Sequence, residues 1–338
     1  MAKLAINGMG RIGKLVLRAL IDEGYDGEIA LLSDKDGDAA LHAHLLEFDT
    51  VHGRWPADFS QDGESIAVNG RRMDFRTASR IEDLPLADLG IELVIDCTGV
   101  FKTPAKVAPY YTAGVRKVVV SAPIKEAPAL NLVYGVNQHL YQAGEHHLIT
   151  AASCTTNCLA PVVKVIHETI GIRHGTMTTV HDVTNTQVIV DRPHKDWRRA
   201  RSALNSLIPT STGSAKAIGL IYPELEGRLN GHAIRVPLLN ASLTDCVFEV
   251  ERKTSTEEVN ALFKAAAEDS PLKGILGYEE RPLVSSDYIN DPRSGIVDGP
   301  STMVINGTQV KVYAWYDNEW GYAWRLADVT RMVAASLD

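Results

Sequence analysis

The sequence predicts an α/β fold: a doubly wound parallel sheet, followed by an α+β part whose sheet is largely antiparallel. Three observations lead to this. Up to about residue 150, short runs rich in Val and Ile alternate with stretches of helical spacing. Beyond that point the β-rich runs are longer and partly alternate, as half-buried antiparallel strands do. The chain also has 338 residues, which is enough for two domains.

The first part of the chain begins with a strand, a helix and a second strand. Lys3–Asn7 has the character of a buried strand, and Arg11–Glu23 follows with apolar residues at helical spacing. Glu28–Ser33 is the second strand. Leu93–Asp96 and Lys117–Val120 continue the pattern. Such alternation implies crossover connections on a parallel sheet, which binds ligands at the carboxyl ends of its strands.

The second part differs in its strands, helices and loops. Its β-rich runs are Met177–Val180, Ala233–Val236 and Ser242–Glu251. Glu257–Glu268 is a helix that begins with a capping-box pattern, Thr254-x-x-Glu257, and Tyr322–Ala335 is the last helix. Asp182–Ser206 is polar and irregular, and loops of that length are usually functional or interfacial.

Composition excludes several classes of protein. A net charge of −8 argues against nucleic-acid binding. No apolar run reaches the roughly 18 residues of a membrane span, and the N-terminus has no signal-peptide pattern, so we expect a cytoplasmic protein without membrane insertion. The cysteines make neither a disulfide framework nor a zinc set, so we expect no metal and at most a reactive thiol. They are Cys97, Cys154, Cys158 and Cys246.

A glycine motif between the first strand and the first helix predicts a dinucleotide site. Gly8, Gly10 and Gly13 form G-x-G-x-x-G, which allows the tight turn and close approach of a pyrophosphate to the helix amides. Asp34 ends the second strand about 20 residues further on, where a carboxylate meets a ribose hydroxyl. The combination predicts a Rossmann-type domain that binds NAD, because Asp34 would repel the 2′-phosphate of NADP.

Cys154 is the candidate nucleophile. It lies between an apolar strand, Leu148–Thr150, and a helical stretch, so it falls near a helix N-terminus, where a thiol pKa is lowered. Cys158, one turn further along, is interpreted as a buried structural cysteine. His181 ends a strand and could reach Cys154, but it is one of 11 histidines and the residue pattern alone does not select it.

Several stretches together resemble the phosphorylating glyceraldehyde-3-phosphate dehydrogenases, and the resemblance runs from end to end of the chain. The matching stretches are residues 6–13, 153–158, 179–181, 208–213, 235–237 and 315–322. The resemblance implies that residues 1–152 form an NAD-binding domain and 153–317 a catalytic domain, with a C-terminal helix, 318–338, that returns to the first. It also implies a homotetramer, with Asp182–Ser206 as the loop between subunits.

The resemblance assigns roles to individual residues. Cys154 would attack the aldehyde and His181 would act as its base, giving a thioester that inorganic phosphate cleaves. The implied cofactor contacts are Gly8, Gly10, Arg11, Ile12, Gly13, Asp34, Ser121, Asn318 at the nicotinamide amide and Tyr322 beside the ring. The implied phosphate contacts are Thr184 and Arg235 for the substrate's own phosphate, and Ser153, Thr155, Arg199, Thr212 and Gly213 for the attacking one.

Three segments resemble a subgroup associated with organoarsenical efflux. They are residues 150–154, 181–187 and 232–246. Members of that subgroup are thought to use arsenate in place of phosphate and to make 1-arseno-3-phosphoglycerate for export by a partner transporter. Two alternatives remain open at this point: an erythrose-4-phosphate dehydrogenase, and a binding protein that has kept the fold and lost the chemistry.

Overall fold

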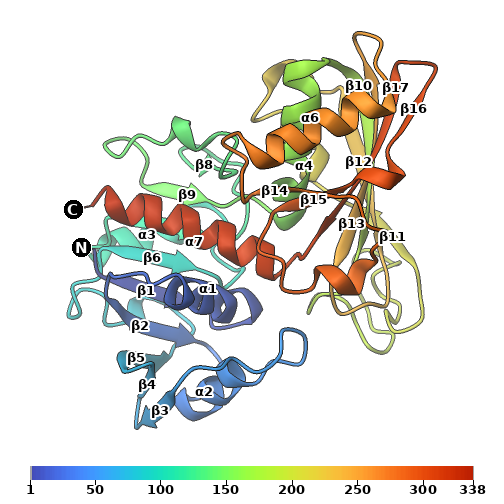
Figure 1. Ribbon diagram of the computed structural model, residues 1–338. Helices are drawn as coiled ribbons and strands as arrows, with labels where there is room; N and C mark the ends of the chain where they lie inside the picture. The colour runs from blue at the N-terminus through green and yellow to red at the C-terminus, as the bar shows by residue number, and fades with distance from the viewer. Residues whose placement is uncertain (1, 338) are drawn as a thin grey trace. The chain divides into compact units, whose positions relative to one another are not determined.

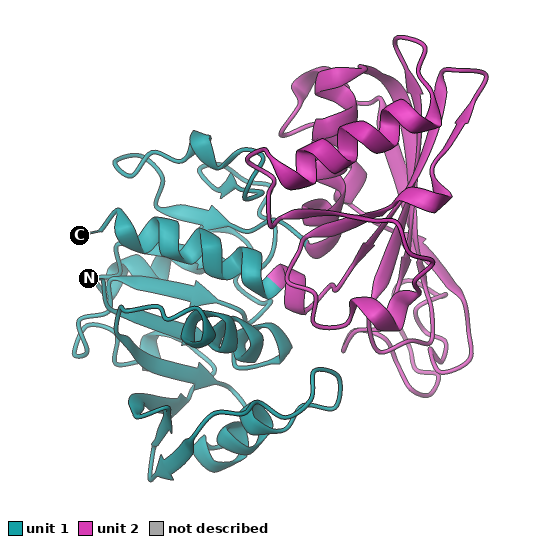
Figure 2. Ribbon diagram, viewed as in Figure 1, with its two compact units in different colours: residues 1–153, 323–338 teal, residues 154–322 magenta. Residues whose placement is uncertain are grey.

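The computed structural model describes residues 2–337, which divide into two compact units. Unit 1 holds the residues up to Ser153 together with those from Ala323 onward, and unit 2 holds Cys154–Tyr322 (Figure 2). None of the helices that these residues form combines the length and the hydrophobicity that crossing a bilayer requires.

Unit 1 is built on a nine-stranded sheet with the order β3-β4-β5-β2-β1-β6-β7-β9-β8 (Figure 1). Its strands are β1 Leu4–Asn7, β2 Ile29–Asp34, β3 Phe59–Asp62, β4 Ser65–Val68, β5 Arg71–Thr77, β6 Leu93–Asp96, β7 Lys117–Val120, β8 Leu130–Asn131 and β9 Leu148–Thr150. Its first three helices are α1 Arg11–Asp22, α2 Ala39–Glu47 and α3 Pro104–Thr112. Short 3₁₀ turns cover Ile81–Asp83 and Gln138–Leu140.

The centre of this sheet is parallel, as predicted. Strand β1 pairs in parallel with β2 on one side and with β6 on the other, and β6 pairs in parallel with β7. Asn7, Asp96 and Val120 stand at matching register positions at the ends of their strands. The carboxyl ends of these strands therefore share one edge, which is where ligands bind in this architecture.

Alternating residues of these strands make two apolar faces, which explains why the sequence forms a sheet covered on both sides. One face packs on α3 through Val107 and Tyr110, which join a buried cluster with residues of the central strands. Helices α1 and α7 lie in front of the sheet in Figure 1, and Arg331 of α7 binds Glu23 at the end of α1. Each fully buried Leu, Ile or Val in these layers contributes about 1.5–3 kcal/mol.

Unit 2 is built on an eight-stranded sheet. Seven of its strands follow the order β11-β12-β10-β13-β17-β15-β14, and the eighth, β16, pairs with β17. Its strands are β10 Ile172–His181, β11 Ile208–Ser211, β12 Leu229–Arg235, β13 Ser242–Val250, β14 Leu276–Glu279, β15 Gly295–Asp298, β16 Met303–Ile305 and β17 Gln309–Tyr316. Its helices are α4 Cys154–Thr169, α5 Ser214–Ile218, α6 Thr256–Glu268 and the start of α7 Trp320–Ala335. Short 3₁₀ turns cover Pro223–Leu225, Ser285–Tyr288 and Gly299–Ser301.

The sheet of unit 2 is largely antiparallel, as predicted, with two exceptions. Strands β10 and β12 run parallel, as do β14 and β15. Along β13 every second residue is buried, which is the alternation on which the antiparallel prediction rested. That alternation predicts which face of the sheet each side chain lies on. It does not predict the direction of the neighbouring strand, because side chains alternate with a period of two in parallel and antiparallel pairs alike.

Two predicted helix starts were wrong by one or two residues. Helix α6 begins at Thr256, because the side chain of Ser255 caps it by accepting from the amide of Glu258 at 3.2 Å. Thr254 instead donates its hydroxyl to the Glu258 carboxylate. Helix α7 begins at Trp320, since the Asp317 carboxylate accepts from the Trp320 amide at 2.7 Å.

Candidate active site

A sharp turn between β9 and α4 sets the position of Cys154. Ala152 lies in that turn with a φ of 52°, a left-handed conformation that costs a residue with a Cβ roughly 1 kcal/mol. Cys154 is then the first residue of α4, beside amides that have no partner within the helix. The predicted placement of this thiol at a helix N-terminus is confirmed.

The imidazole of His181 reaches Cys154 from the end of a central strand. His181 is the last residue of β10, which lies between β12 and β13. Its Nε2 stands 3.7 Å from the Cys154 Sγ, and its ring meets the ring of Tyr316 edge-on, with 6.0 Å between centroids. The structure thus brings together the two residues that the resemblance names as nucleophile and base.

The two groups shift each other's pKa toward an ion pair. Burial alone would raise the pKa of the Cys154 thiol, but the hydrogen bond and charge of His181, followed by the charge of Arg235, lower it below its ordinary value. Burial alone would lower the pKa of His181. The Asp182 carboxylate and the Cys154 sulfur outweigh burial and raise it to about 9. The site therefore favours a thiolate beside an imidazolium.

In the remaining cysteines burial decides the direction of the pKa shift. Burial raises the pKa of Cys158 to about 12, and its Sγ faces the Ala314 carbonyl at 3.8 Å. Burial also raises the pKa of Cys97 and of Cys246. Cys158 is fully buried, so its interpretation as a structural residue is confirmed.

Tyr316 contacts both elements of the site through its hydroxyl, and no sequence motif predicted this contact. Its hydroxyl lies 2.9 Å from the Thr155 hydroxyl and 2.8 Å from that of Thr179, so it ties the first turn of α4 to β10. Thr155 and Tyr316 are 161 residues apart in the chain. A contact of that separation depends on sheet register, which a motif does not encode.

Arg235 lies against the far side of the catalytic imidazole. It pairs in register with His181, and its Nη1 stands 2.7 Å from the His181 Nδ1 and 3.0 Å from the Asp182 carbonyl oxygen. Thr184 follows three residues after His181, and its hydroxyl donates to the Gln187 side chain at 3.0 Å. Of the two predicted contacts for the substrate phosphate, Arg235 therefore contacts the His181 ring from β12, and Thr184 lies three residues further along the chain, in the loop that follows β10.

Three of the residues expected around the attacking phosphate, Arg199, Thr212 and Gly213, lie beside β11, whereas Ser153 and Thr155 flank the first residue of α4. Arg199 donates from Nε to the Thr210 hydroxyl at 2.9 Å, and this hydroxyl in turn donates to Asp196. Thr212 accepts from the Ser214 amide at 3.2 Å, next to Gly213 at the start of α5. Burial lowers the pKa of Arg235, and the charge of Arg199 acts in the same direction. Ser153 directly precedes Cys154 in the chain.

Asn318 and Tyr322 are both buried: Asn318 lies just before α7, and Tyr322 lies in its first turn. The side-chain oxygen of Asn318 accepts from the Ser242 hydroxyl at 3.0 Å, and this hydroxyl also accepts from the Asp182 amide at 3.2 Å. A short chain of hydrogen bonds therefore joins Asn318 to the residue after the base.

In unit 1 the glycines of the motif meet the requirements for binding a dinucleotide. Gly8 has a φ of 95°, and a Cβ there would stand 2.5 Å from the Thr98 backbone nitrogen. A Cβ on Gly13 would stand 2.0 Å from the Gly8 carbonyl oxygen, so α1 approaches the loop as closely as it can. A Cβ on Gly10 would meet open space, and no side chain of the described residues caps α1 there. The cradle and the helix amides fit a pyrophosphate.

The other predicted cofactor residues surround this loop or end neighbouring strands. Asp34 ends β2, and Ser121 directly follows β7. Ile12 is half-buried in the first turn of α1. Arg11 beside it forms a bidentate ion pair with Asp49, in which Nη1 and Nη2 donate to the two carboxylate oxygens at 2.5 and 3.0 Å.

Lys14 is a feature of unit 1 that sequence reasoning missed. Burial lowers its pKa to about 8, against the opposing charge of Asp34. Its Nζ lies 3.1 Å from the Nδ1 of His42. A lysine among the apolar residues of the first helix was the only available signal.

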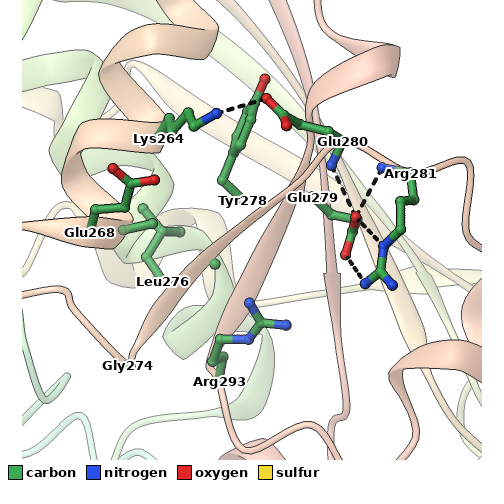
Figure 3. A pocket seen from close by; sticks show the side chains of 11 residues that line it. Lys264, Glu268, Gly274, Leu276, Tyr278, Glu279, Glu280, Arg281 and Arg293 are labelled. Carbon is green, nitrogen blue, oxygen red and sulfur yellow. Dashed lines mark hydrogen bonds and ion pairs between the residues drawn. The ribbon is translucent and has the colours of Figure 1, made fainter.

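A surface pocket of about 600 Å³ on unit 2 contains none of the predicted site residues (Figure 3). Most of its charged side chains are engaged in ion pairs. Lys264 pairs with Glu280 at 3.0 Å, and Arg281 pairs with Glu279 at 2.7 Å. Arg293 pairs with Asp291 at 2.6 Å. The candidate active site therefore remains the cysteine and histidine at the ends of α4 and β10.

Comparisons with known proteins agree with this geometry. Residues 2–104 match the family described as glyceraldehyde 3-phosphate dehydrogenase, NAD binding domain, and residues 153–318 match its C-terminal domain. The chain is 59% identical over 335 residues to glyceraldehyde-3-phosphate dehydrogenase 3 of Nostoc sp., covering 99% of both proteins. It is 49% identical over 333 residues to the glyceraldehyde-3-phosphate dehydrogenase of Geobacillus stearothermophilus, covering 98% of both. The chain therefore belongs to the glyceraldehyde-3-phosphate dehydrogenase family, with NAD as its cofactor.

Proposed function

We propose that the protein oxidises D-glyceraldehyde 3-phosphate with NAD and transfers the acyl group to inorganic phosphate, giving 1,3-bisphosphoglycerate. The observation that carries this proposal is the distance of 3.7 Å between the Cys154 Sγ and the His181 Nε2 at a helix N-terminus. This arrangement supplies an activated sulfur nucleophile with a general base beside it.

In the proposed mechanism, the Cys154 thiolate attacks the aldehyde carbon and forms a hemithioacetal. The His181 imidazolium protonates the developing oxyanion and then, as the neutral base, takes the hydroxyl proton back while hydride leaves. NAD, when bound, accepts that hydride. The product is a thioester on Cys154, which phosphate cleaves to release the acyl phosphate and the thiolate. The backbone amide of Cys154 stabilises the oxyanion, a contribution of about 3 kcal/mol.

We propose that unit 1 binds NAD and that unit 2 carries the chemistry. Asp34 would hold a ribose hydroxyl, Arg11, Ile12 and Ser121 would contact the cofactor, and Asn318 and Tyr322 would position the nicotinamide. Arg235 and Thr184 would bind the substrate phosphate. The support for Arg235 is its contact with the His181 ring, and the support for Thr184 is its position in the chain, three residues after His181. The residues proposed for the attacking phosphate are Ser153, Thr155, Arg199, Thr212 and Gly213.

The anion that cleaves the thioester is the second part of the proposal, and we propose arsenate as a physiological alternative to phosphate. Both anions share charge and shape, so one site accepts both. The support is the resemblance of residues 150–154, 181–187 and 232–246 to the subgroup associated with organoarsenical efflux. The product would be 1-arseno-3-phosphoglycerate, exported by a partner transporter.

We also propose a homotetramer located in the cytoplasm. Its support is apolar surface on residues 182–207, the irregular loop of unit 2. Trp197 is 87% exposed in the single chain, and other large apolar side chains of this loop are exposed with it. They are Ile189, Val190, Leu204 and Leu207. Light scattering coupled to gel filtration should give four times the subunit mass of 36.9 kDa.

The test is the appearance of NADH on mixing protein, NAD and glyceraldehyde 3-phosphate, with phosphate or arsenate added in separate runs. Cys154→Ser should lower the rate about a thousandfold or more. The matched control is Cys158→Ser on the same helix, which should retain most of the rate. A ratio of kcat/KM that favours arsenate supports the arsenic role, whereas equal values leave it to an export assay. Faster turnover of erythrose 4-phosphate than of the triose would overturn the substrate assignment.

A further inference from the structure

The Asp182 carboxylate lies against the catalytic histidine and is completely buried. Its Oδ1 stands 2.8 Å from the His181 Nδ1, on the side of the ring away from Cys154. The residue has no exposed surface. Removing a carboxylate from water is costly unless an opposite charge compensates it, so this position needs a physical reason.

The surroundings of the carboxylate point to His181 as its partner. Burial raises the pKa of Asp182, while the adjacent His181 ring, through its contact and its charge, and then the amide of Asn318, oppose that rise. The charge of Glu319 acts with burial. The imidazolium is thus the main compensation for this buried charge.

A second group competes for the same ring nitrogen. The Arg235 Nη1 stands 2.7 Å from the His181 Nδ1. A guanidinium can only donate, so it favours a bare Nδ1 and a neutral imidazole. The Asp182 carboxylate, at 2.8 Å, and the Asp182 carbonyl oxygen, at 2.9 Å, can only accept, so they favour a proton on Nδ1. The charge of His181 depends on which side prevails.

We propose that Asp182 is a positioning residue that holds His181 as the imidazolium against the charge of Arg235, and so keeps Cys154 a thiolate before the aldehyde binds. The inference rests on the proposed function only in taking Cys154 as the nucleophile. Asp182 itself touches neither the sulfur nor the reacting carbon in this mechanism; it acts through the ring.

The other groups that face the His181 ring do not stabilise a proton on Nδ1 as the Asp182 carboxylate does. From α4 the ring faces the Cys154 sulfur, and from β12 it faces Arg235. From β17 it faces Tyr316, whose hydroxyl is engaged by two threonines and whose pKa is raised well above its ordinary value by burial, so it stays neutral. Glu319 acts on the Asp182 carboxylate. Asp182 is therefore the carboxylate that contacts the Nδ1 side of the ring.

The test measures the rate of Cys154 alkylation by iodoacetamide against pH, with the labelled peptide identified by mass spectrometry. It needs neither aldehyde nor NAD. Asp182→Asn keeps the shape of the side chain and removes its charge. We expect the midpoint of thiolate formation to rise by about one pH unit, which slows alkylation about tenfold below that midpoint. The matched control is Asp245→Asn, which removes another partly buried carboxylate of unit 2 and should leave the midpoint in place.

A midpoint for folded Asp182→Asn within about 0.3 unit of the wild-type value would overturn the inference. If circular dichroism shows that this variant does not fold, Asp182→Ser supplies the same comparison with a smaller polar side chain, and an unchanged midpoint there would overturn it equally. A wild type with a low midpoint but no NADH production would contradict the proposed function and leave the role of Asp182 standing.

Discussion

The first and second turns of α4 each carry a cysteine, and the two have opposite chemistry. Cys154, at the first position, has a lowered pKa, whereas burial raises the pKa of Cys158 to about 12. Both lie on one helix and share its dipole. They differ in their neighbours: the imidazole of His181 for Cys154, and a backbone carbonyl for Cys158. The difference points to the charge of His181 beside Cys154, in addition to the helix N-terminus, as the cause of its lowered pKa.

The largest expected effect on the difference between the two cysteines comes from removing the His181 imidazolium. His181→Gln keeps a polar side chain at the end of β10 and cannot become charged. We expect alkylation of Cys154 near pH 7 to fall about 100-fold, because the thiolate loses its partner. The measurement is the rate of iodoacetamide labelling at each cysteine. A rate close to wild type would mean that the helix N-terminus suffices by itself.

A second prediction concerns the pH dependence of the stability that His181 contributes. Its pKa rises from 6.5 to about 9 in the folded protein, so its proton stabilises the fold fully below pH 6.5. That stabilisation is lost as pH rises through about 9. The difference in unfolding free energy between wild type and His181→Gln should therefore shrink by about 2 kcal/mol across this window, discounted for coupling to Cys154. Urea denaturation at several pH values measures it, and a difference that grows with pH would contradict the raised pKa.

The third prediction addresses the other cysteine. Cys158→Ser places a hydroxyl where the thiol faces a carbonyl and packs tightly on the backbone near Gly295. We expect a loss of about 1–2 kcal/mol in unfolding free energy, with the alkylation midpoint of Cys154 unchanged. The converse variant, Cys154→Ser, should abolish labelling at its position with little effect on stability. The comparison fails if Cys158→Ser slows the labelling of Cys154.

The smallest expected effect sharpens the comparison with another helix start. The N-terminus of α6 is capped by the Ser255 hydroxyl. Ser255→Ala should cost about 1 kcal/mol of stability, and Thr254→Ala should cost less, because Thr254 bonds a side chain in place of the helix amides. Thermal unfolding of the two variants decides between them. An equal loss of stability in the two variants would favour the capping box that begins at Thr254, as the sequence pattern predicted.

Much of the fold could be predicted from the sequence because local patterns determine it. The strands Leu93–Asp96 and Lys117–Val120 are short apolar runs, and their observed bounds are the predicted ones. The position of Cys154 follows from a strand that ends at Thr150 and a helix that begins within a few residues. In each case the signal lies in a window of about ten residues.

What the sequence could not predict depends on pairing across the sheet. The parallel pairing of β10 and β12 places Arg235 beside His181, although 54 residues separate them in the chain. Asp182 could be noticed as unusual next to the base, but the direction of its carboxylate depends on how the chain turns after β10. Tyr316 belongs to the same class, since its contact with Thr155 spans most of unit 2.

The central place of β10 in its sheet has a consequence for amide exchange. Its backbone is bonded to β12 on one side and to β13 on the other, and the His181 carbonyl still accepts from the Val236 amide at its end. Such amides exchange with solvent slowly, whereas residues 183–207 contain no helix or regular strand and should exchange quickly. His181, the proposed base, is therefore carried by a slowly exchanging strand, and the loop that follows it should exchange faster. Insertions or swaps in that loop can alter what is bound while the proton-transfer geometry stays fixed.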